Sequence, residues 1–152
     1  MKIVVVSDSH GNLTLLQEIL NKNYDADYFI HLGDFELPTY LMSSFLFVKG
    51  NCDYLVENNL YKDIVIGGLK IHLEHGDKIN YSDFDNYIIS KHCAIFLFGH
   101  IHKKIALKID NTYVFNPGSL TRPRDSNKGS YLLLIIDNNK NITYKFEEIN
   151  LD

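Results

Sequence analysis

Five short polar clusters, each directly after an apolar run, are the feature that most limits how this chain can fold. Together they carry seven carboxylate, imidazole and amide side chains of the kinds that bind metal ions. Side chains so far apart in sequence can meet only where a fold gathers the ends of its strands, so we predict one site that holds two divalent metal ions. The clusters are Asp8-Ser9-His10, Gly33-Asp34, Gly50-Asn51-Cys52-Asp53, His75-Gly76-Asp77 and Gly99-His100-Ile101-His102.

The size and composition of the chain are those of one globular unit. With 152 residues, of which 45% are hydrophobic, we expect a single domain over residues 1–152. No stretch approaches the roughly 20 apolar residues that a membrane-spanning helix needs, and no signal-peptide pattern precedes the first strand. We therefore expect a cytoplasmic protein with no membrane partner and with both cysteines as free thiols. A formal net charge of −4 argues against an extensive nucleic-acid surface and favours a small substrate.

Apolar periodicity predicts alternating strands and helices in the first half of the chain and hairpins in the second. Asn12 is the expected N-cap of the first helix, and Gly67-Gly68 is a strong two-residue hairpin signal. We expect strands over residues 3–7, 28–32, 45–49, 60–66, 69–74, 94–98, 105–109, 112–115, 131–136 and 142–147, and helices over residues 13–21, 38–43 and 84–91.

This order of elements predicts an α+β fold, a four-layer α/β/β/α sandwich in which two packed mixed β-sheets are flanked by helices. In such a sandwich the strands would be buried on both faces. Every polar cluster falls just beyond the carboxyl end of a strand, which is where open α/β sheets tend to place their ligands. The fold and the chemistry therefore indicate the same edge of the molecule.

Each cluster taken alone has a structural explanation. Asp8 and His10 could form a turn or cap a helix without binding a metal ion. His75 could be a buried histidine, because it shares a face with apolar residues of its strand. His100 and His102 are more specific, since two imidazoles at positions i and i+2 after a buried strand can reach neighbouring metal ions. The case for a metal site depends on the joint occurrence of all five clusters.

The same clusters, with the first extended to Asp8-Ser9-His10-Gly11-Asn12 and with Asn116-Pro117-Gly118-Ser119 added, closely resemble the motifs of the calcineurin-like metallophosphoesterases. The resemblance is to their small bacterial and archaeal phosphodiesterase branch, and it covers the whole chain. It implies that Asp34 bridges two metal ions. The first ion would be held by Asp8, His10, Asp34 and His102, and the second by Asp34, Asn51, His75 and His100.

The resemblance also implies an activity. We expect a dinuclear-metal phosphoesterase, and a phosphodiesterase in particular, in which Asp34, Asn51 and His75 act through a metal-bridging hydroxide that attacks phosphorus in line, without a separate protein nucleophile. The mixed oxygen and imidazole ligands suit Mn²⁺, our first choice, and also Ni²⁺, Fe²⁺ or Zn²⁺. The alternatives are a phosphomonoesterase and a non-catalytic interaction scaffold like the retromer subunit of this fold. Similar proteins often form homodimers or higher homo-oligomers, and the sequence leaves the oligomeric state of this chain open.

Several residues near the motifs keep two interpretations. Cys52, where the broader superfamily often has histidine, is either a small buried thiol or a weak proton donor. Asp53 and Asp77 either orient a ligand or belong to turns. Arg122 and Arg124 either bind a substrate phosphate or are solvated loop residues. The histidines without a motif role, expected in the core or on the surface, are His31, His72 and His92.

Overall fold

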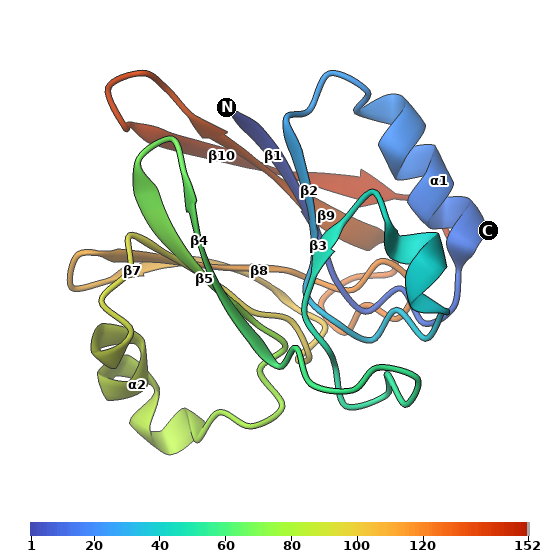
Figure 1. Cartoon of the computed structure of the whole chain (residues 1–152), viewed down its shortest axis with the longest axis horizontal. Helices are drawn as coiled ribbons and strands as arrows, with labels where there is room; N and C mark the ends of the chain where they lie inside the picture. The colour runs from blue at the N-terminus through green and yellow to red at the C-terminus, as the bar shows by residue number, and fades with distance from the viewer. Residues whose placement is uncertain (152) are drawn as a thin grey trace.

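The computed structural model describes residues 1–151 and has two five-stranded β-sheets packed face to face (Figure 1). The first sheet has the strand order β10-β9-β1-β2-β3. Its strands are β1 (Lys2–Val6), β2 (Tyr28–His31), β3 (Leu46–Phe47), β9 (Gly129–Ile136) and β10 (Ile142–Ile149). The second sheet has the order β4-β5-β6-β8-β7. Its strands are β4 (Tyr61–Ile66), β5 (Leu69–Glu74), β6 (Ile95–Leu97), β7 (Lys104–Ile109) and β8 (Thr112–Pro117).

Both sheets mix parallel and antiparallel pairs. Strand β1 is parallel to β2 and antiparallel to β9, while β6 is parallel to both β5 and β8. The hairpins β4-β5, β7-β8 and β9-β10 add antiparallel pairs. The predicted mixed α+β sandwich is confirmed, including the hairpin that turns at Gly67 and Gly68, both of which have positive φ angles.

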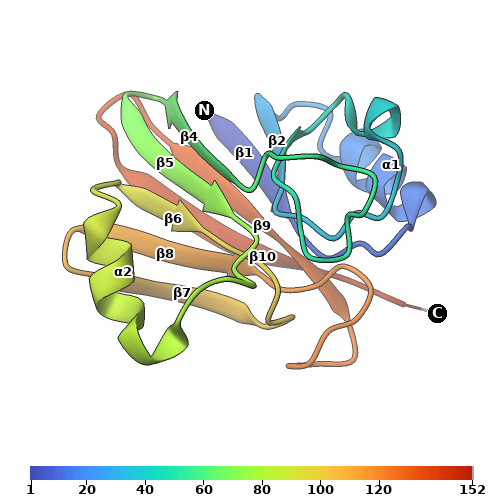
Figure 2. The same cartoon turned by 60° about the horizontal axis from the view of Figure 1, so that its bottom comes forward.

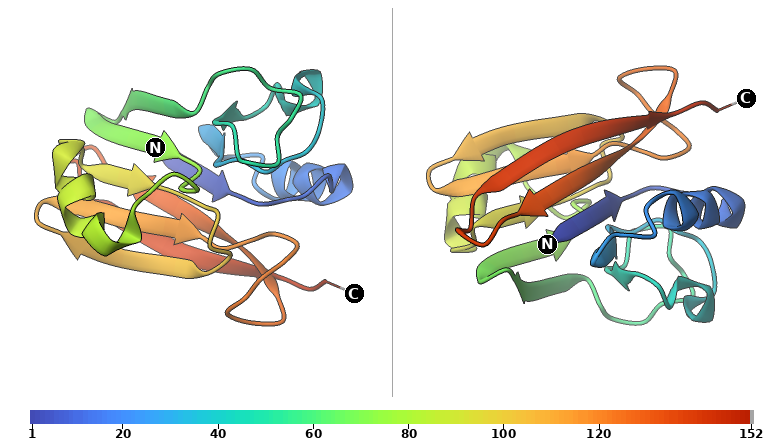
Figure 3. Two further views of the ribbon diagram at one scale, coloured as in Figure 1. Left: turned by 90° about the horizontal axis from the view of Figure 1, so that it is seen from below. Right: turned by 90° about the horizontal axis from the view of Figure 1, so that it is seen from above.

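One helix covers the outer face of each sheet. Helix α1 (Leu13–Lys22) packs Leu16 and Ile19 against Val4 and Val6 of β1, and α2 (Phe84–Ser90) packs Ile88 on the second sheet. Figure 2 shows α2 lying across β6 and β8. Figure 3 shows the two helices at opposite sides of the molecule. The side chain of Asn12 accepts a hydrogen bond from the backbone N–H of Leu15 at 3.0 Å, which confirms it as the N-cap.

Two short segments differ from their expected form. The helix expected over residues 38–43 is a single turn of 3-10 helix, η1 (Thr39–Met42), and a second one, η2 (Tyr81–Asp83), precedes α2. The strand expected over residues 45–49 is reduced to β3, because the Lys49 N–H donates to the Asn59 carbonyl at 2.8 Å and so directs the chain away from the sheet.

The main core lies between the sheets. Alternate residues of β1, such as Val5, face this core, while Val4 and Val6 face α1. Burial on both faces therefore holds for the central strands β1 and β6, but it is wrong for the edge strands β4, β7 and β10, whose outer faces carry exposed residues such as Val65. One short helix on each side is too small to cover five strands.

Strands β1, β2 and β3 run parallel in the first sheet, and β5 and β6 run parallel in the second. The loops that follow these five strands carry the five polar clusters. Across residues 1–151 no helix combines the length and the apolar composition needed to cross a membrane.

Candidate metal centre

Backbone hydrogen bonds join neighbouring loops within each sheet, those after β1 and β2 in the first sheet and those after β5 and β6 in the second. The Asp8 N–H donates to the Gly33 carbonyl at 3.0 Å, and the His10 N–H donates to the Asp34 carbonyl at 3.0 Å. In the second sheet the Gly99 N–H donates to the His75 carbonyl at 2.8 Å. These bonds hold neighbouring clusters in register, so their side chains project into one volume.

Five of the predicted ligands form two compact groups. Asp8, His10 and His102 make the first, and Asp8, Asp34 and His75 make the second; within each group the ligand atoms lie within 4.8 Å of one another.

The other two predicted ligands lie beside the second group. Asn51 places its Oδ1 atom 3.0 Å from His75 Nε2, and the ring centroid of His100 lies 5.1 Å from that of His75. All seven predicted ligands are therefore neighbours in space.

The carboxylate shared by the two groups is Asp8, whereas the resemblance implied that Asp34 is shared. Asp8 is fully buried, and its Oδ1 atom lies 3.1 Å from His102 Nε2 and 3.9 Å from His75 Nε2. Asp34 places Oδ2 3.2 Å from His75 Nε2 and accepts the Cys52 N–H on Oδ1 at 2.8 Å. The bridging role of Asp34 stays a prediction.

The hydrogen bonds of His75 determine which of its nitrogens is free. Its Nδ1 atom lies 2.8 Å from the Leu32 carbonyl oxygen, which can only accept, so Nδ1 carries the proton. In the neutral ring Nε2 then presents a lone pair to two oxygens, Asn51 Oδ1 at 3.0 Å and Asp34 Oδ2 at 3.2 Å. Three acceptors that face one another repel unless a positive charge lies between them, which is the arrangement that a metal ion requires.

In the first group, Asp8, His10 and His102, imidazole nitrogens also face a carboxylate oxygen. The Nδ1 atom of His102 lies 2.7 Å from the Arg122 carbonyl, which directs Nε2 toward Asp8. His10 has Nδ1 3.2 Å from Glu36 Oε1, while its Nε2 atom is buried without a hydrogen-bond partner among residues 1–151. An orphaned imidazole nitrogen 3.9 Å from a buried carboxylate oxygen fits a cation that binds between them.

The electrostatic balance of the site favours positive charge. Burial lowers the pKa of His75, but the hydrogen bond to Asp34 and the negative charges of Asp8 and Asp34 outweigh it and raise that pKa to about 9. Burial likewise raises the pKa of Asp34, yet the contact with His75 dominates and brings it to about 2. Without a metal ion, a proton on His75 supplies the charge that these carboxylates need.

Asp53 acts on the site through the backbone. Its carboxylate accepts the N–H groups of Asp34 at 2.7 Å, Gly50 at 2.8 Å and Glu36 at 2.8 Å, so it fixes the loops that carry Asp34 and Asn51. These contacts are to backbone N–H groups and not to a ligating histidine or asparagine, so the orienting role of Asp53 stays a prediction. Asp77 instead lies 3.8 Å from Lys78, as expected of a turn carboxylate.

The buried histidine His31 organises the loops, a role that sequence reasoning missed. Its Nδ1 atom accepts the Gly33 N–H at 3.1 Å, so its Nε2–H donates to Ser9 Oγ at 2.8 Å. Burial lowers the pKa of His31 to about 3, which keeps the ring neutral and this tautomer intact. Its place two residues before the Gly33-Asp34 cluster was the only signal in the sequence.

The turn at residues 116–119 braces the ligand loops from the other side. Ser119 Oγ donates to the Asp8 carbonyl at 2.9 Å, and Asn116 Nδ2 donates to the Gly99 carbonyl at 2.8 Å. Arg122 contributes its carbonyl to His102, whereas the guanidinium groups of Arg122 and Arg124 are exposed on the loop that follows.

Cys52 is at the rim of the site and is only partly buried, so the buried-thiol interpretation is wrong. Desolvation and the nearby carboxylates of Asp34 and Glu36 raise the pKa of its thiol to about 11. The group is therefore neutral at neutral pH.

The backbone of the site is strained. Five of the seven candidate ligands have left-handed φ angles, a conformation that costs a residue with a Cβ atom about 1–2 kcal/mol. Such strain persists where the surrounding structure enforces it and gathers at functional sites. The angles are 55° for Asp8, 45° for His10, 58° for Asp34, 70° for His100 and 58° for His102.

Residues 1–139 match the family model for the calcineurin-like phosphoesterase superfamily domain. A probable metallophosphoesterase of Bacillus subtilis, YsnB, is 31% identical over 148 residues, which cover 91% of this chain and 86% of the relative. The phosphodiesterase YfcE of Escherichia coli is 23% identical over 163 residues, with 88% of this chain and 87% of the relative covered.

Solved structures share the fold. A conserved protein of Streptococcus pneumoniae, described as a predicted phosphoesterase, is 27% identical with a TM-score of 0.82 and 97% of each chain covered. The Vps29 protein of Entamoeba histolytica, in a structure complexed with Zn²⁺, is 21% identical with a TM-score of 0.72, and the match covers 99% of this chain and 100% of that one.

Proposed function

Because this chain belongs to the calcineurin-like phosphoesterase superfamily, we propose that it is a phosphodiesterase that works with two divalent metal ions. The observation that carries this proposal is the convergence of imidazole nitrogens and carboxylate oxygens in two groups that share Asp8. The name of the E. coli relative YfcE supports the diester preference.

The donor set fits two such ions. We assign Asp8, His10 and His102 to one position and Asn51, His75 and His100 to the other, with Asp34 between them. A shared carboxylate offsets the repulsion between dications that lie roughly 3.5–4 Å apart. Oxygen and imidazole donors suit Mn²⁺, our first choice, and also Fe²⁺, Ni²⁺ or Zn²⁺. The Zn²⁺ complex of a protein with this fold is consistent with that range.

Bound ions would supply an activated water near neutral pH and neutralise charge on the phosphate. The residues of the chain would position the reactants. Leu32 and Arg122 fix the imidazoles of His75 and His102 through their carbonyl groups, and Asp53 holds the Asp34 loop. Arg122 and Arg124 are exposed beside His102, where a guanidinium could bind a phosphate oxygen in a bidentate manner.

A phosphomonoesterase uses the same centre, and a non-catalytic scaffold is the alternative from another class, since Vps29 proteins share the fold. The complete ligand set, together with relatives named as a metallophosphoesterase and a phosphodiesterase, favours an enzyme. We also propose a single domain acting on a small phosphate ester in the cytoplasm, as a homodimer or a higher homo-oligomer.

The test is hydrolysis of bis-p-nitrophenyl phosphate and p-nitrophenyl phosphate with Mn²⁺, Zn²⁺ and excess chelator, together with elemental analysis. Asp34→Asn should lower turnover at least about a hundredfold, given the several kcal/mol that metal ions contribute. His100→Ala should lose metal, whereas His92→Ala, which removes an exposed histidine after α2, should not. Near-native turnover of Asp34→Asn with both ions bound would refute the assignment. Inactivity of the wild-type protein with every metal would favour the scaffold.

A further inference from the structure

A cavity of about 440 Å³ opens directly beside the metal centre. It lies between the segment that follows Asp34 and the segment that follows Asn51, and its wall is largely apolar. The lining residues are Glu36, Leu37, Cys52, Asp53, Tyr54, Leu55 and Val56.

The inner wall of the cavity is also the wall of the metal centre. Glu36 places Oε1 3.2 Å from Nδ1 of His10, and the Cys52 N–H donates to Asp34 Oδ1 at 2.8 Å. A phosphate ester bound over the two ligand groups therefore has one of its substituents within reach of the cavity.

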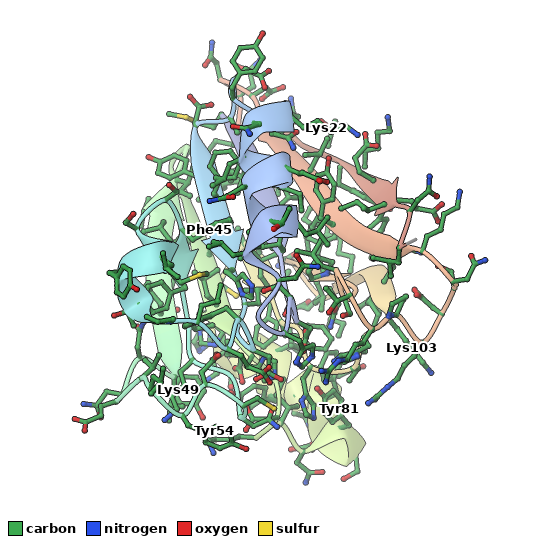
Figure 4. The ribbon with its side chains drawn as sticks, turned by 90° about the vertical axis from the view of Figure 1, so that its right-hand side faces the viewer. Lys22, Phe45, Lys49, Tyr54, Tyr81 and Lys103 are labelled. Carbon is green, nitrogen blue, oxygen red and sulfur yellow. The ribbon has the colours of Figure 1, made fainter. Side chains whose placement is uncertain are left out.

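The mouth of the cavity carries large apolar side chains in water. Tyr54 is 85% exposed and Leu55 is 73% exposed, whereas Val56 beneath them is 6% exposed. Figure 4 shows Tyr54 at the same end of the molecule as Tyr81 and far from Lys22. An exposed aromatic ring offers a stacking surface to a flat ligand group.

The charge of the lining restricts the ligand further. Glu36, whose side chain is 33% exposed, brings a carboxylate to the wall, and the buried carboxylate of Asp53 lies behind it. Both would repel a second phosphate or a carboxylate on the substrate, while the apolar wall offers little to a polyol.

From this geometry we propose that the cavity binds the leaving group of the substrate, and that this group is an uncharged aromatic ring. The inference rests on the proposed phosphodiesterase function and names its substrate class. Hydrolysis would break the P–O bond to the aromatic alcohol, water would supply the new oxygen on phosphorus, and a proton from that water would end on the departing alcohol.

Two methyl phosphodiesters test the proposal, one with a phenol and one with a fluorinated aliphatic alcohol of matched acidity as the leaving group. The ratio of their kcat/KM values then reports recognition of the ring rather than chemical reactivity. Tyr54→Ala should lower the aryl-to-alkyl ratio by roughly 2- to 10-fold, the value of one aromatic contact. Tyr24→Ala, which removes a tyrosine that is 87% exposed just beyond α1, should leave rates and ratio unchanged.

A binding experiment separates failure of this inference from failure of the proposed function. We expect phenol, which is uncharged at neutral pH, titrated into the metal-free protein, to shift the amide NMR signals of Leu37 and residues 54–56, and Tyr54→Ala to abolish the shifts. An active enzyme whose ratio does not change in Tyr54→Ala would refute the inference alone. If the protein hydrolyses neither diester, the titration decides, and absence of these shifts would overturn the aromatic site. Shifts that depend on protein concentration without ligand would instead identify a contact between copies.

Discussion

Replacing His100 by glycine should leave the metal-free protein more stable than replacing it by alanine. Both variants remove the imidazole, and both retain the backbone N–H that donates to Asp8 Oδ2 at 3.1 Å. They differ only in the Cβ atom, which stands on a residue with φ of 70°. The pair therefore isolates the backbone strain at one candidate ligand.

The magnitude follows from two opposing terms. A Cβ atom in the left-handed region costs about 1–2 kcal/mol, and glycine loses about 0.5–1 kcal/mol through its greater freedom in the unfolded chain. The midpoints of the two ranges differ by about 0.75 kcal/mol, which is the expected net difference in the free energy of unfolding in favour of His100→Gly. Urea denaturation with excess chelator measures it through the shift of the midpoint at constant slope.

A second pair at Gln17, exposed in α1, provides the control. There the helical backbone favours alanine, so Gln17→Gly should be less stable than Gln17→Ala by about 1 kcal/mol. Opposite signs at the two positions would support the strain argument. It would be wrong if His100→Ala were as stable as His100→Gly while the Gln17 pair behaved as expected.

Three further predictions concern the rest of the molecule. Asp53→Asn places an amide where three N–H groups need acceptors, so it should lower the free energy of unfolding by about 2–3 kcal/mol, as measured by denaturation. It should also weaken metal binding roughly 10- to 100-fold by calorimetry, and an unchanged affinity would contradict the orienting role. Metal ion at 100 times its Kd should add about 2.7 kcal/mol of stability that chelation removes, and a thermal midpoint insensitive to every divalent ion would oppose a metal site. Hydrogen bonds from the N–H and side chain of Asn141 hold the pKa of Asp137 below its ordinary 3.8. The stability that these bonds contribute is therefore complete above pH 3.8 and is lost as the pH falls through the lowered pKa. The stability gap between wild type and Asp137→Asn should therefore close in acid, and a gap independent of pH would refute it.

The sequence predicts the strands and the polar clusters at their ends because both depend on side-chain type and apolar periodicity. Asp8 and His75 are recognisable in this way, as is Asn12, whose side chain caps a helix by a local rule. The predicted burial of the outer faces of β4, β7 and β10 was wrong. Periodicity shows that a strand has an apolar face, but it does not show how much of a sheet a helix covers.

What the sequence could not provide works mainly through the backbone. The Leu32 and Arg122 carbonyls orient the imidazoles, and any residue type can supply a carbonyl group. The left-handed angles are also hidden, because histidine and aspartate are not residues that indicate such a conformation as glycine does. His31 was missed for a related reason, since its role depends on the tautomer that its neighbours select.

The two sheets meet at the candidate metal centre, and each provides part of it. Asp8 follows a strand of the first sheet, while His102 follows a strand of the second, 94 residues later. An ion held by both would act as a reversible cross-link that closes a loop of that length. By the loop-entropy argument used for disulfides, such a link stabilises a fold by about 4.7 kcal/mol relative to an unfolded chain that cannot hold the ion. A protein whose two cysteines are free would thus obtain from a divalent cation the cross-link that secreted proteins obtain from disulfide bonds. The concentration of that cation would then determine how stably the two sheets are held together.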